Sequence, residues 1–431
     1  MSRPSVTPDV TTRTAGRALA GVGSGNFRLL WFGEGISVLG SATTGVLLPL
    51  LAVVELDAGP GLMGALTALA WLPWLLIGLP AGAWVDRMRP RTVMIVADLV
   101  SAVTLLTVPV AWWLGWLNPL HLIAVAFCGG VATVFFRTAY VSIIPMIVVD
   151  RGLETANARL IGTESVMQIT GPGLAGFLAQ RLSASGGLLT GVVGFLVSAL
   201  CLWRIRPADR ITAVGPEESG TLVSRIAAGV RFVVHDRVLR TFTIIGGISN
   251  LGLTGYTSLL VLHLVRGLGL TPGAVGVVMM IGSCGGLLGS LCATAVARRI
   301  GTGRASTVFL LVAGPSAVLI GIPTDGRLVA LTVTGLVLVG LGVVAGNVIR
   351  AAWRQRYVPS QLMGRVVTAT QVVNFGTMPV AGFAAGWLGT EFGVRPTILI
   401  MAGIHALACV GILLTRLGRT RNLPTSPEAA A

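Results

Sequence analysis

Long apolar segments separated by short polar connections make up most of this chain. A helix needs about 20 apolar residues to cross the hydrocarbon core of a bilayer, and twelve segments are of about this length or longer. They lie near residues 28–54, 62–84, 92–115, 119–148, 157–181, 186–204, 239–265, 272–297, 305–323, 328–353, 362–388 and 396–416. The pattern predicts an all-α integral membrane protein with two sets of six spans.

The residues outside the spans define the expected organisation of the chain. In the long break between the two sets, Leu222, Ile226, Val230 and Val233 recur at helical spacing, which predicts an amphipathic helix on the inner membrane surface. The start of the chain is rich in Ser, Thr, Gly and Arg and lacks the apolar core of a signal peptide. We expect a disordered cytoplasmic tail (1–26), an N-terminal six-helix bundle (27–204), a cytoplasmic linker (205–238), a C-terminal six-helix bundle (239–416) and a cytoplasmic tail (417–431).

Composition and charge agree with a membrane protein. Only 11% of the residues are charged and 54% are hydrophobic, whereas about 25% of the residues of a soluble domain are charged. All 31 basic residues are arginines. Apart from Arg137 and Arg350, which fall inside spans, they gather before span one and after every even-numbered span, with Arg181, Arg266, Arg327 and Arg395 as the exceptions. Because arginine beside a span stays on the cytoplasmic side, this pattern predicts a multi-pass protein of the inner or plasma membrane with both termini cytoplasmic. The net charge of +15 therefore gives no indication of nucleic-acid binding.

The five cysteines and four histidines indicate no metal site. The cysteines lie inside apolar segments without metal-type spacing, and the histidines are far apart in the sequence. We expect neither a metal nor a cofactor.

The two sets of spans resemble each other. Pro60-x-x-x-Gly64 opens span two and Pro272-x-x-x-Gly276 opens span eight, at an offset of 212 residues (272 − 60). RTAY, which begins at Arg137, matches RAAW, which begins at Arg350, at an offset of 213 (350 − 137). Two matches at nearly one offset indicate a duplicated bundle, as in many transporters.

Two motifs resemble those of the major facilitator superfamily. Gly82, Asp86, Arg87 and Arg91 match the glycine, acid and bases of the family's loop between spans two and three. In span five, Gly171, Pro172, Gly173 and Gly176 resemble the glycine-proline motif of proton-coupled antiporters, and ordinary small-residue packing is the alternative. The phrases LPAGAWVDR, ANARL and GRVVTAT are similar to the branch of drug, macrolide and siderophore exporters, although no basic residue precedes Arg137 early in span four. The resemblance implies 12 transmembrane helices in two pseudo-symmetric six-helix bundles, the major facilitator fold.

The resemblance also implies a conformational latch at the inner face. It would place Asp86 against the start of span eleven, near residues 360–364, where an anion interacts favourably with the helix N-terminus. Asp98, in span three, is expected to neutralise Arg87 or Arg91. In the alternative interpretation, the hairpin only orients the protein by its charge.

Several charged residues fall inside spans, where they are costly and are candidates for function by default. Glu34 is the leading candidate for the proton carrier, with a position near the inner interface as the alternative. Arg137 needs an acidic partner, for which Glu34, Asp98 and Glu164 are available, and either a coupling pair or a structural ion pair would result. Arg350 is the corresponding cation of span ten.

Polar residues also recur on the spans that line the central cavity in this superfamily. Ser37, Ser41 and Thr44 follow Glu34 at i+3, i+7 and i+10, which places them on one face of span one. The remaining candidates for cavity lining are Gln168, Asn250, Thr254, Ser258 and Asn374.

The leading hypothesis is a proton-coupled exporter that moves a hydrophobic or amphipathic small molecule, such as an antibiotic or siderophore, by alternating access. Its partners would be the substrate, protons and the lipid bilayer, and it would act as a monomer. Uptake or facilitated movement of a nutrient by the same fold is the alternative. An enzyme is not expected, because the sequence contains no nucleophile paired with a base, and a receptor without transport activity is the remotest alternative.

Overall fold

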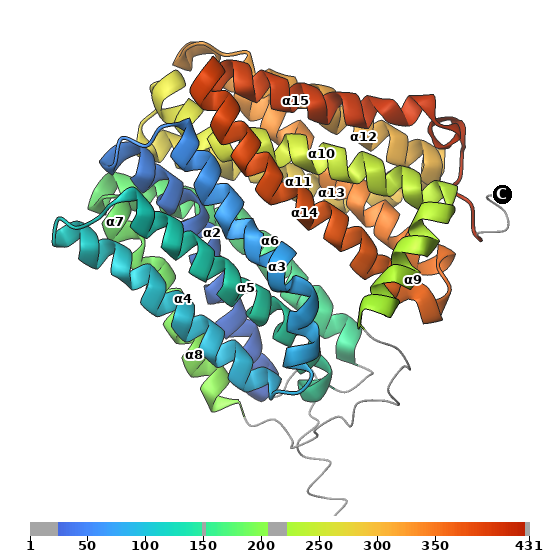
Figure 1. Cartoon of the computed structure of the whole chain (residues 1–431), viewed down its shortest axis with the longest axis horizontal. Helices are drawn as coiled ribbons and strands as arrows, with labels where there is room; N and C mark the ends of the chain where they lie inside the picture. Colours follow the sequence, from blue (N-terminus) through green and yellow to red (C-terminus); the bar gives the residue numbers. More distant parts are fainter. Residues whose placement is uncertain (1–24, 149–151, 206–221, 427–431) are drawn as a thin grey trace, which may run out of the picture.

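The structure is a computed structural model that describes residues 25–148, 152–205 and 222–426. Most of the predicted N-terminal tail, much of the predicted linker and the last five residues lie outside these ranges. Nearly all described residues are helical. The N-terminal half (blue to green in Figure 1) consists of α2 (Gly25–Glu55), α3 (Pro60–Val85), α4 (Pro90–Trp113), α5 (Pro119–Ile147), α6 (Leu153–Leu182), the short α7 (Ala184–Gly187) and α8 (Leu189–Arg204).

The C-terminal half (yellow-green to red in Figure 1) repeats this arrangement after a connecting helix. That helix is α9 (Leu222–His235). The half itself consists of α10 (Arg237–Leu262), the π-helical turn η2 (His263–Gly267), α11 (Pro272–Ile300), α12 (Thr302–Gly321), the 3-10 turn η3 (Gly326–Leu328), α13 (Val329–Tyr357), α14 (Ser360–Phe392), α15 (Val394–Val410) and the 3-10 turns η4 (Gly411–Leu414) and η5 (Arg416–Arg419). The twelve long helices match the twelve predicted spans, so the predicted fold class is confirmed.

Local sequence signals set where these helices begin. Proline occupies the first turn of α3, α4, α5 and α11, where its missing N–H costs no helical hydrogen bond. Side chains cap the starts of α5, α10 and α11: Asn118 accepts from the N–H of His121, Asp236 from Leu239, and Thr271 from Ala274. The connections between helices are consequently short and their positions follow from the sequence.

Ten of the long helices are apolar enough to be recognised as spans by length and composition alone. The remaining two are α6 and α14, which carry polar residues such as Glu164 and Asn374 along their length. Both pack against a helix of the other half, α6 on α11 and α14 on α3. A helix covered by protein need not be apolar all round, so polar residues are tolerated in these two.

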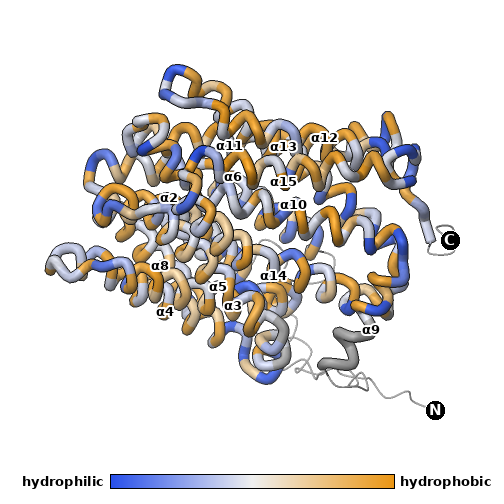
Figure 2. Tube along the Cα trace, turned by 45° about the horizontal axis from the view of Figure 1, so that its top comes forward, coloured by the Kyte–Doolittle hydropathy of each residue, from blue (hydrophilic) through white to orange (hydrophobic). Residues whose placement is uncertain are grey.

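Hydrophobic residues dominate the long helices, and hydrophilic residues gather at their ends and in the connections (Figure 2). This distribution is the one expected for helices that cross a bilayer.

The two halves approach most closely through glycines. A Cβ atom added to Gly64 of α3 would lie 2.4 Å from the carbonyl oxygen of Gly382 in α14. A Cβ atom added to Gly176 of α6 would lie 2.7 Å from Cα of Gly276 in α11. Only glycine allows the backbones of two helices to come this close. The repeated Pro-x-x-x-Gly pattern therefore marks two places where helices of the two halves pack backbone to backbone.

The buried core shows that the halves are joined at one end and separate at the other. One continuous hydrophobic cluster includes residues of both halves, among them Leu50, Met63, Leu259 and Val275. At the opposite end, which we call the linker end because α9 lies there, each half has a cluster of its own. The end shared by both halves, which contains the α2–α3 connection, is called the far end below. The molecule is thus closed at the far end and divided at the linker end.

The helix α9 belongs to the C-terminal half. It packs on α14, where a Cβ atom added to Gly229 would lie 2.3 Å from the carbonyl oxygen of Arg365. Asp236, just after α9, accepts a hydrogen bond from the hydroxyl of Tyr357 at 2.5 Å. These contacts fix the described part of the linker to the ends of α13 and α14.

Candidate functional site

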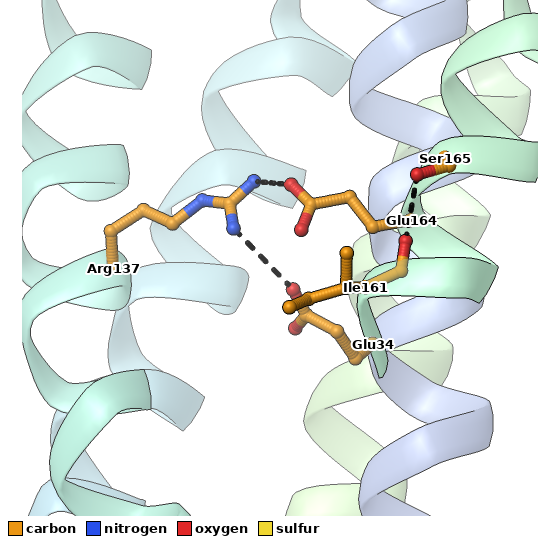
Figure 3. A network of polar contacts seen from close by, with 5 residues as sticks. All are labelled: Glu34, Arg137, Ile161, Glu164 and Ser165. Carbon is orange, nitrogen blue, oxygen red and sulfur yellow. Dashed lines mark hydrogen bonds and ion pairs between the residues drawn. The ribbon is translucent and has the colours of Figure 1, made fainter. Parts of the chain in front are cut away.

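The most prominent polar site is a cluster of two acids and one arginine inside the N-terminal half. Glu34 comes from α2, Arg137 from α5 and Glu164 from α6, and their side chains point toward one another (Figure 3). Nη2 of Arg137 lies 2.8 Å from Oε1 of Glu164, and Nη1 lies 4.0 Å from Oε1 of Glu34. Of the three acids expected as partners of Arg137, Glu34 and Glu164 lie beside it. We call these three residues the acid–arginine cluster.

The two acids of the cluster are held differently. Glu164 makes a direct hydrogen bond to the guanidinium, whereas Glu34 makes only a longer ion-pair contact. Glu34 is 6% exposed, and its Oε2 is buried without a hydrogen-bond partner. A buried acceptor without a partner is costly, and protonation of the carboxyl group would remove part of that cost. Glu34 is thus the acid of the cluster better suited to exchange a proton.

A hydrogen bond beside the cluster joins α2 and α6, the helices that carry the two acids. The indole N–H of Trp31 in α2 donates to Oγ1 of Thr163 in α6 at 2.7 Å. A Cβ atom added to Gly35 would lie 3.1 Å from Cγ2 of the same threonine. This contact fixes the separation between Glu34 and Glu164.

Asp98 is not where the sequence predicted it to act. It was expected to neutralise Arg87 or Arg91, but among the described residues Asp98 takes part in none of the ion pairs. It is 2% exposed, faces Ser198 of α8, and its Oδ2 has no hydrogen-bond partner. The expected pair does not form because a helical residue points its side chain to one face of the helix, and Asp98 points toward α8.

The predicted latch residues differ in exposure and in their hydrogen-bond partners. Asp86 and Arg87 are exposed, and the backbone N–H of Asp86 bonds to the carbonyl oxygen of Gly82 at the end of α3. Arg91 donates to the carbonyl oxygens of Leu202, at 2.8 Å, and of Trp203, so it caps the last turn of α8. The last carbonyls of a helix attract a cation, which accounts for this position. The contact of Asp86 with the start of α14 stays a prediction, because the halves are divided at this end.

The glycine-proline motif of α6 packs against two helices. A Cβ atom added to Gly171 would lie 2.5 Å from Cβ of Ala42 in α2, and one added to Gly173 would lie 2.6 Å from the sulfur of Met280 in α11. Gly176 meets Gly276 of α11 as described above, and Pro172 lies inside a helix that continues from Leu153 to Leu182. The motif therefore joins α2 of its own half to α11 of the other half.

A cavity of about 420 Å³ lies within the N-terminal half. Of the predicted lining residues, Ser41 and Thr44 contribute to it. Its walls come from α2, α3, α4, α5 and α8, and they include Thr67, Trp71, Trp74, Ser101, Thr104 and Thr133. Most of the lining is apolar, and its polar side-chain groups are hydroxyls and the indole N–H groups of Trp71 and Trp74, which suits an uncharged or weakly polar molecule. Thr133 lies one helical turn from Arg137, so the cavity ends near the acid–arginine cluster.

The aromatic wall of this cavity was not found from the sequence. Trp71 and Trp74 of α3 contact Phe375 of α14, with ring centroids 5.8 Å and 4.9 Å apart. The spacing i, i+3 of Trp71 and Trp74 was the available signal, since it places both rings on one face of α3.

Several predicted lining residues are not brought to this cavity. Ser37, Thr254 and Ser258 are buried in the packed interior, and the hydroxyl of Ser258 donates to the carbonyl oxygen of Gly255 in its own helix. Gln168 is exposed. Helical periodicity identifies residues that share a face, but it cannot tell a face that lines a cavity from one that packs on a neighbouring helix.

The remaining polar candidates lie in the C-terminal half. Nδ2 of Asn250 donates to the carbonyl oxygen of Asn374 at 3.3 Å, which links α10 to α14. Arg350 of α13 donates to Oδ1 of Asn347 at 2.8 Å. Neither contact involves the N-terminal half. A group of three or more His, Cys, Asp or Glu side chains that could hold a metal ion is not found in the described ranges.

One ion pair joins the two halves at the far end. Nη2 of Arg266, in η2, lies 2.5 Å from Oδ1 of Asp57 and 3.3 Å from the carbonyl oxygen of Val53. Asp57 follows α2 in a left-handed conformation with φ of 50°. The sequence interpretation had set Arg266 aside as an exception to the charge pattern.

Comparison with known proteins gives consistent matches. The family model described as Major Facilitator Superfamily matches residues 30–382. The chain is 27% identical over 413 residues to the multidrug efflux pump Tap of Mycobacterium tuberculosis, covering 93% of this chain and 95% of that protein. It is 20% identical over 403 residues to macrolide efflux protein A of Streptococcus pyogenes, covering 92% and 97%.

Solved structures share the fold at low identity. The nucleoside transporter NupG superposes with a TM-score of 0.72 at 12% identity, covering 91% of this chain and 99% of that one. An inward-facing, unoccupied bacterial homologue of the lysosomal transporter Spinster superposes with a TM-score of 0.67 at 13% identity, covering 92% and 97%.

Proposed function

The chain belongs to the Major Facilitator Superfamily, and from this premise we propose that it is a proton-coupled exporter of hydrophobic or amphipathic small molecules. The observation that carries the proposal is the acid–arginine cluster at the end of an apolar cavity. Two carboxyl groups share one guanidinium, and the second oxygen of Glu34 has no partner. Such a site can bind and release one proton while Arg137 and Glu164 stay paired.

The direction in which the protein faces follows from its arginines. Arg87, Arg89 and Arg91 lie at the linker end, and basic residues beside spans stay in the cytoplasm. The linker end is then cytoplasmic, and a molecule that is closed at the far end and divided at the linker end is open to the inside. This orientation is part of the proposal.

Transport would proceed by alternating access. In the open-inward state the halves are held at the far end by the glycine contacts and by the Asp57–Arg266 pair. In the outward state these contacts would part, and Asp86 would meet the N-terminus of α14 at the other end. The proton and the apolar part of the substrate would use the N-terminal half in turn, because the cavity and Glu34 lie on the same helices.

The size and lining of the cavity support a small apolar cargo. A volume of about 420 Å³ lies within the usual range of about 300–1,000 Å³ for small-molecule sites. The relatives named for multidrug and macrolide efflux support export rather than uptake. The packing of α6 on α11 through its glycine-proline motif also supports export, because the motif resembles that of antiporters.

The proposal is tested by replacing Glu34 with Gln and measuring export in a cell that lacks its own exporters. A glutamine keeps the shape of the side chain but cannot carry a proton. We expect Glu34→Gln to abolish proton-driven export of a fluorescent apolar probe, while Glu154→Gln, an exposed acid in the first turn of α6, leaves export within about twofold of wild type. Undiminished export by the Glu34→Gln variant would reject the role of this carboxyl group.

A further inference from the structure

Arg350 of α13 is a cation inside the C-terminal half with an incomplete set of partners. Its Nη2 donates to Asn347, its guanidinium carbon lies 6.0 Å from the centroid of the Phe242 ring, and its Nη1 is buried without a hydrogen-bond partner. Ionisable residues in membrane spans are costly and are retained mainly where they serve a function. The proposed mechanism assigns no role to this arginine.

The side chain does not turn toward the membrane interface. Arg350 lies seven residues (357 − 350) before the end of α13 at Tyr357, or about 10 Å from the linker end. An arginine at that depth could extend its side chain to the interface. Instead the guanidinium folds back over the preceding turn, where a Cβ atom added to Gly346 would lie 2.9 Å from Nη1. The charge is thereby held deeper in the half than the backbone that carries it.

Comparison with the N-terminal half shows what Arg350 lacks. Arg350 corresponds to Arg137 at an offset of 213, and Arg137 is balanced by Glu34 and Glu164. At offsets of 212 and 213 from Glu34 the chain has Gly246 and Gly247.

The described helices of the C-terminal half hold no substitute acid in their interior. Across its described helices, the acids are Asp236 at the N-terminus of α10, Asp325 at the start of η3 and Glu391 near the end of α14. The C-terminal half has therefore kept the arginine of the duplicated pair without the acids that neutralise it. No ion pair of Arg350 is present among the described residues.

We propose that Arg350 binds an acidic group of the transported molecule, so that the substrates include amphipathic organic acids. A carboxylate on the cargo would supply the missing negative charge and would accept a hydrogen bond from the unpartnered Nη1. Asn374, whose buried Oδ1 also lacks a partner, adds an acceptor in the same half for a hydroxyl or amide group of the cargo. This inference rests on the proposed function, because it concerns the cargo of the same transporter.

The test compares a zwitterionic rhodamine free acid with its methyl ester, which differ by one negative charge. Binding of each dye to the purified full-length protein is measured by fluorescence titration for wild type, Arg350→Gln and Arg350→Lys. Arg354→Gln, one turn nearer the end of α13, is the matched control. We expect Arg350→Gln to weaken binding of the acid by about 10- to 100-fold and binding of the ester by less than about twofold, because hydrogen bonds to charged groups are among the stronger ones.

The lysine variant distinguishes a role of the positive charge in binding from a purely structural role of Arg350. Lysine keeps the charge but not the fork of donors, so Arg350→Lys should retain affinity for the acid between the values of wild type and Arg350→Gln. Equal losses for acid and ester would overturn the proposal and indicate a structural role, or a role as partner to the acids of the other half. Unchanged binding of the acid by Arg350→Gln, or failure of wild type to bind it, would also overturn the proposal.

Binding in detergent needs neither a gradient nor transport, so the two proposals can fail separately. A protein that binds the acid through Arg350 but does not export it would refute export alone. A protein that exports both dyes regardless of Arg350 would refute this inference alone.

Discussion

Adding one methyl group at the contact between the halves should shift the protein toward the state that is open at the far end. In Gly64→Ala, the new Cβ atom would lie 2.4 Å from the carbonyl oxygen of Gly382 and 2.5 Å from Cα of Gly386. A carbon–oxygen contact relaxes to about 3.3 Å, so the helices must separate by about 0.9 Å (3.3 − 2.4). Both obstructing groups belong to backbone, which cannot move aside as a flexible side chain would.

The size of the effect follows from the cost of overpacking. Inserting a methyl group into a close contact costs about 1–3 kcal/mol, which changes the ratio of the two states by about 5- to 150-fold. This cost falls only on the state in which α3 and α14 touch at Gly64. The conformation open at the far end does not make the contact and does not bear the cost.

Distances between spin labels can detect this shift. One pair of labels would be placed at Leu120 and Thr324, which are exposed at the far end of the two halves, and a second pair at Met88 and Gln355 at the linker end. In a cysteine-free background, Gly64→Ala should lengthen the far-end distance and shorten the linker-end distance.

Gly78→Ala provides the matched control for this experiment. Gly78 lies in the same helix, and its added Cβ atom would meet only Trp74 of that helix, at an ordinary 3.6 Å. The change in helix propensity is the same for both variants, so it cannot account for a difference between them. Distance distributions for Gly64→Ala that equal those of Gly78→Ala would refute the argument.

Two further predictions concern contacts between the halves. Asp57→Asn should shift the same equilibrium by at most about 1 kcal/mol, because the pair with Arg266 is exposed. The exchanged pair, Asp57→Arg with Arg266→Asp, should restore the wild-type distances between the spin labels. Failure of the exchange to restore them would argue against an ionic role. Trp71→Ala removes a cavity wall and its contact with Phe375, so KM for an aromatic probe should rise by about two- to tenfold. Trp112→Ala, outside the cavity, should leave KM unchanged. Equal effects of the two variants would show that Trp71 does not contact the substrate.

The helices of this protein could be predicted from its sequence because the bilayer imposes a length and a composition on them. The predicted span 119–148, for example, agrees with α5 at Pro119–Ile147 to within a residue. Proline and capping residues mark many of the ends, and the distribution of arginines indicates which connections share a side. These signals are local, so one sequence carries them without knowledge of neighbouring helices.

Contacts between helices were predictable only where charge restricted the choice. Arg137 required an acid, and two of the three candidates, Glu34 and Glu164, are its partners. For Asp98 the sequence offered Arg87 or Arg91 as opposite charges, whereas its side chain faces the hydroxyl of Ser198 in α8. Likewise, the sequence placed Thr254 on a polar face of its helix, but it could not show that this face is buried in the packed interior. Which face meets which neighbour depends on the register of the bundle, which no local pattern records.

Proton release on substrate binding tests the central claim most directly. A purified exporter in weakly buffered detergent solution is mixed with a saturating apolar probe, and the change in pH is recorded alongside probe binding. If Glu34 exchanges its proton for substrate, wild type should release up to one proton per bound probe, and Glu34→Gln should bind the probe without releasing any. Binding by wild type without proton release, or equal release by Glu34→Gln, would contradict the account.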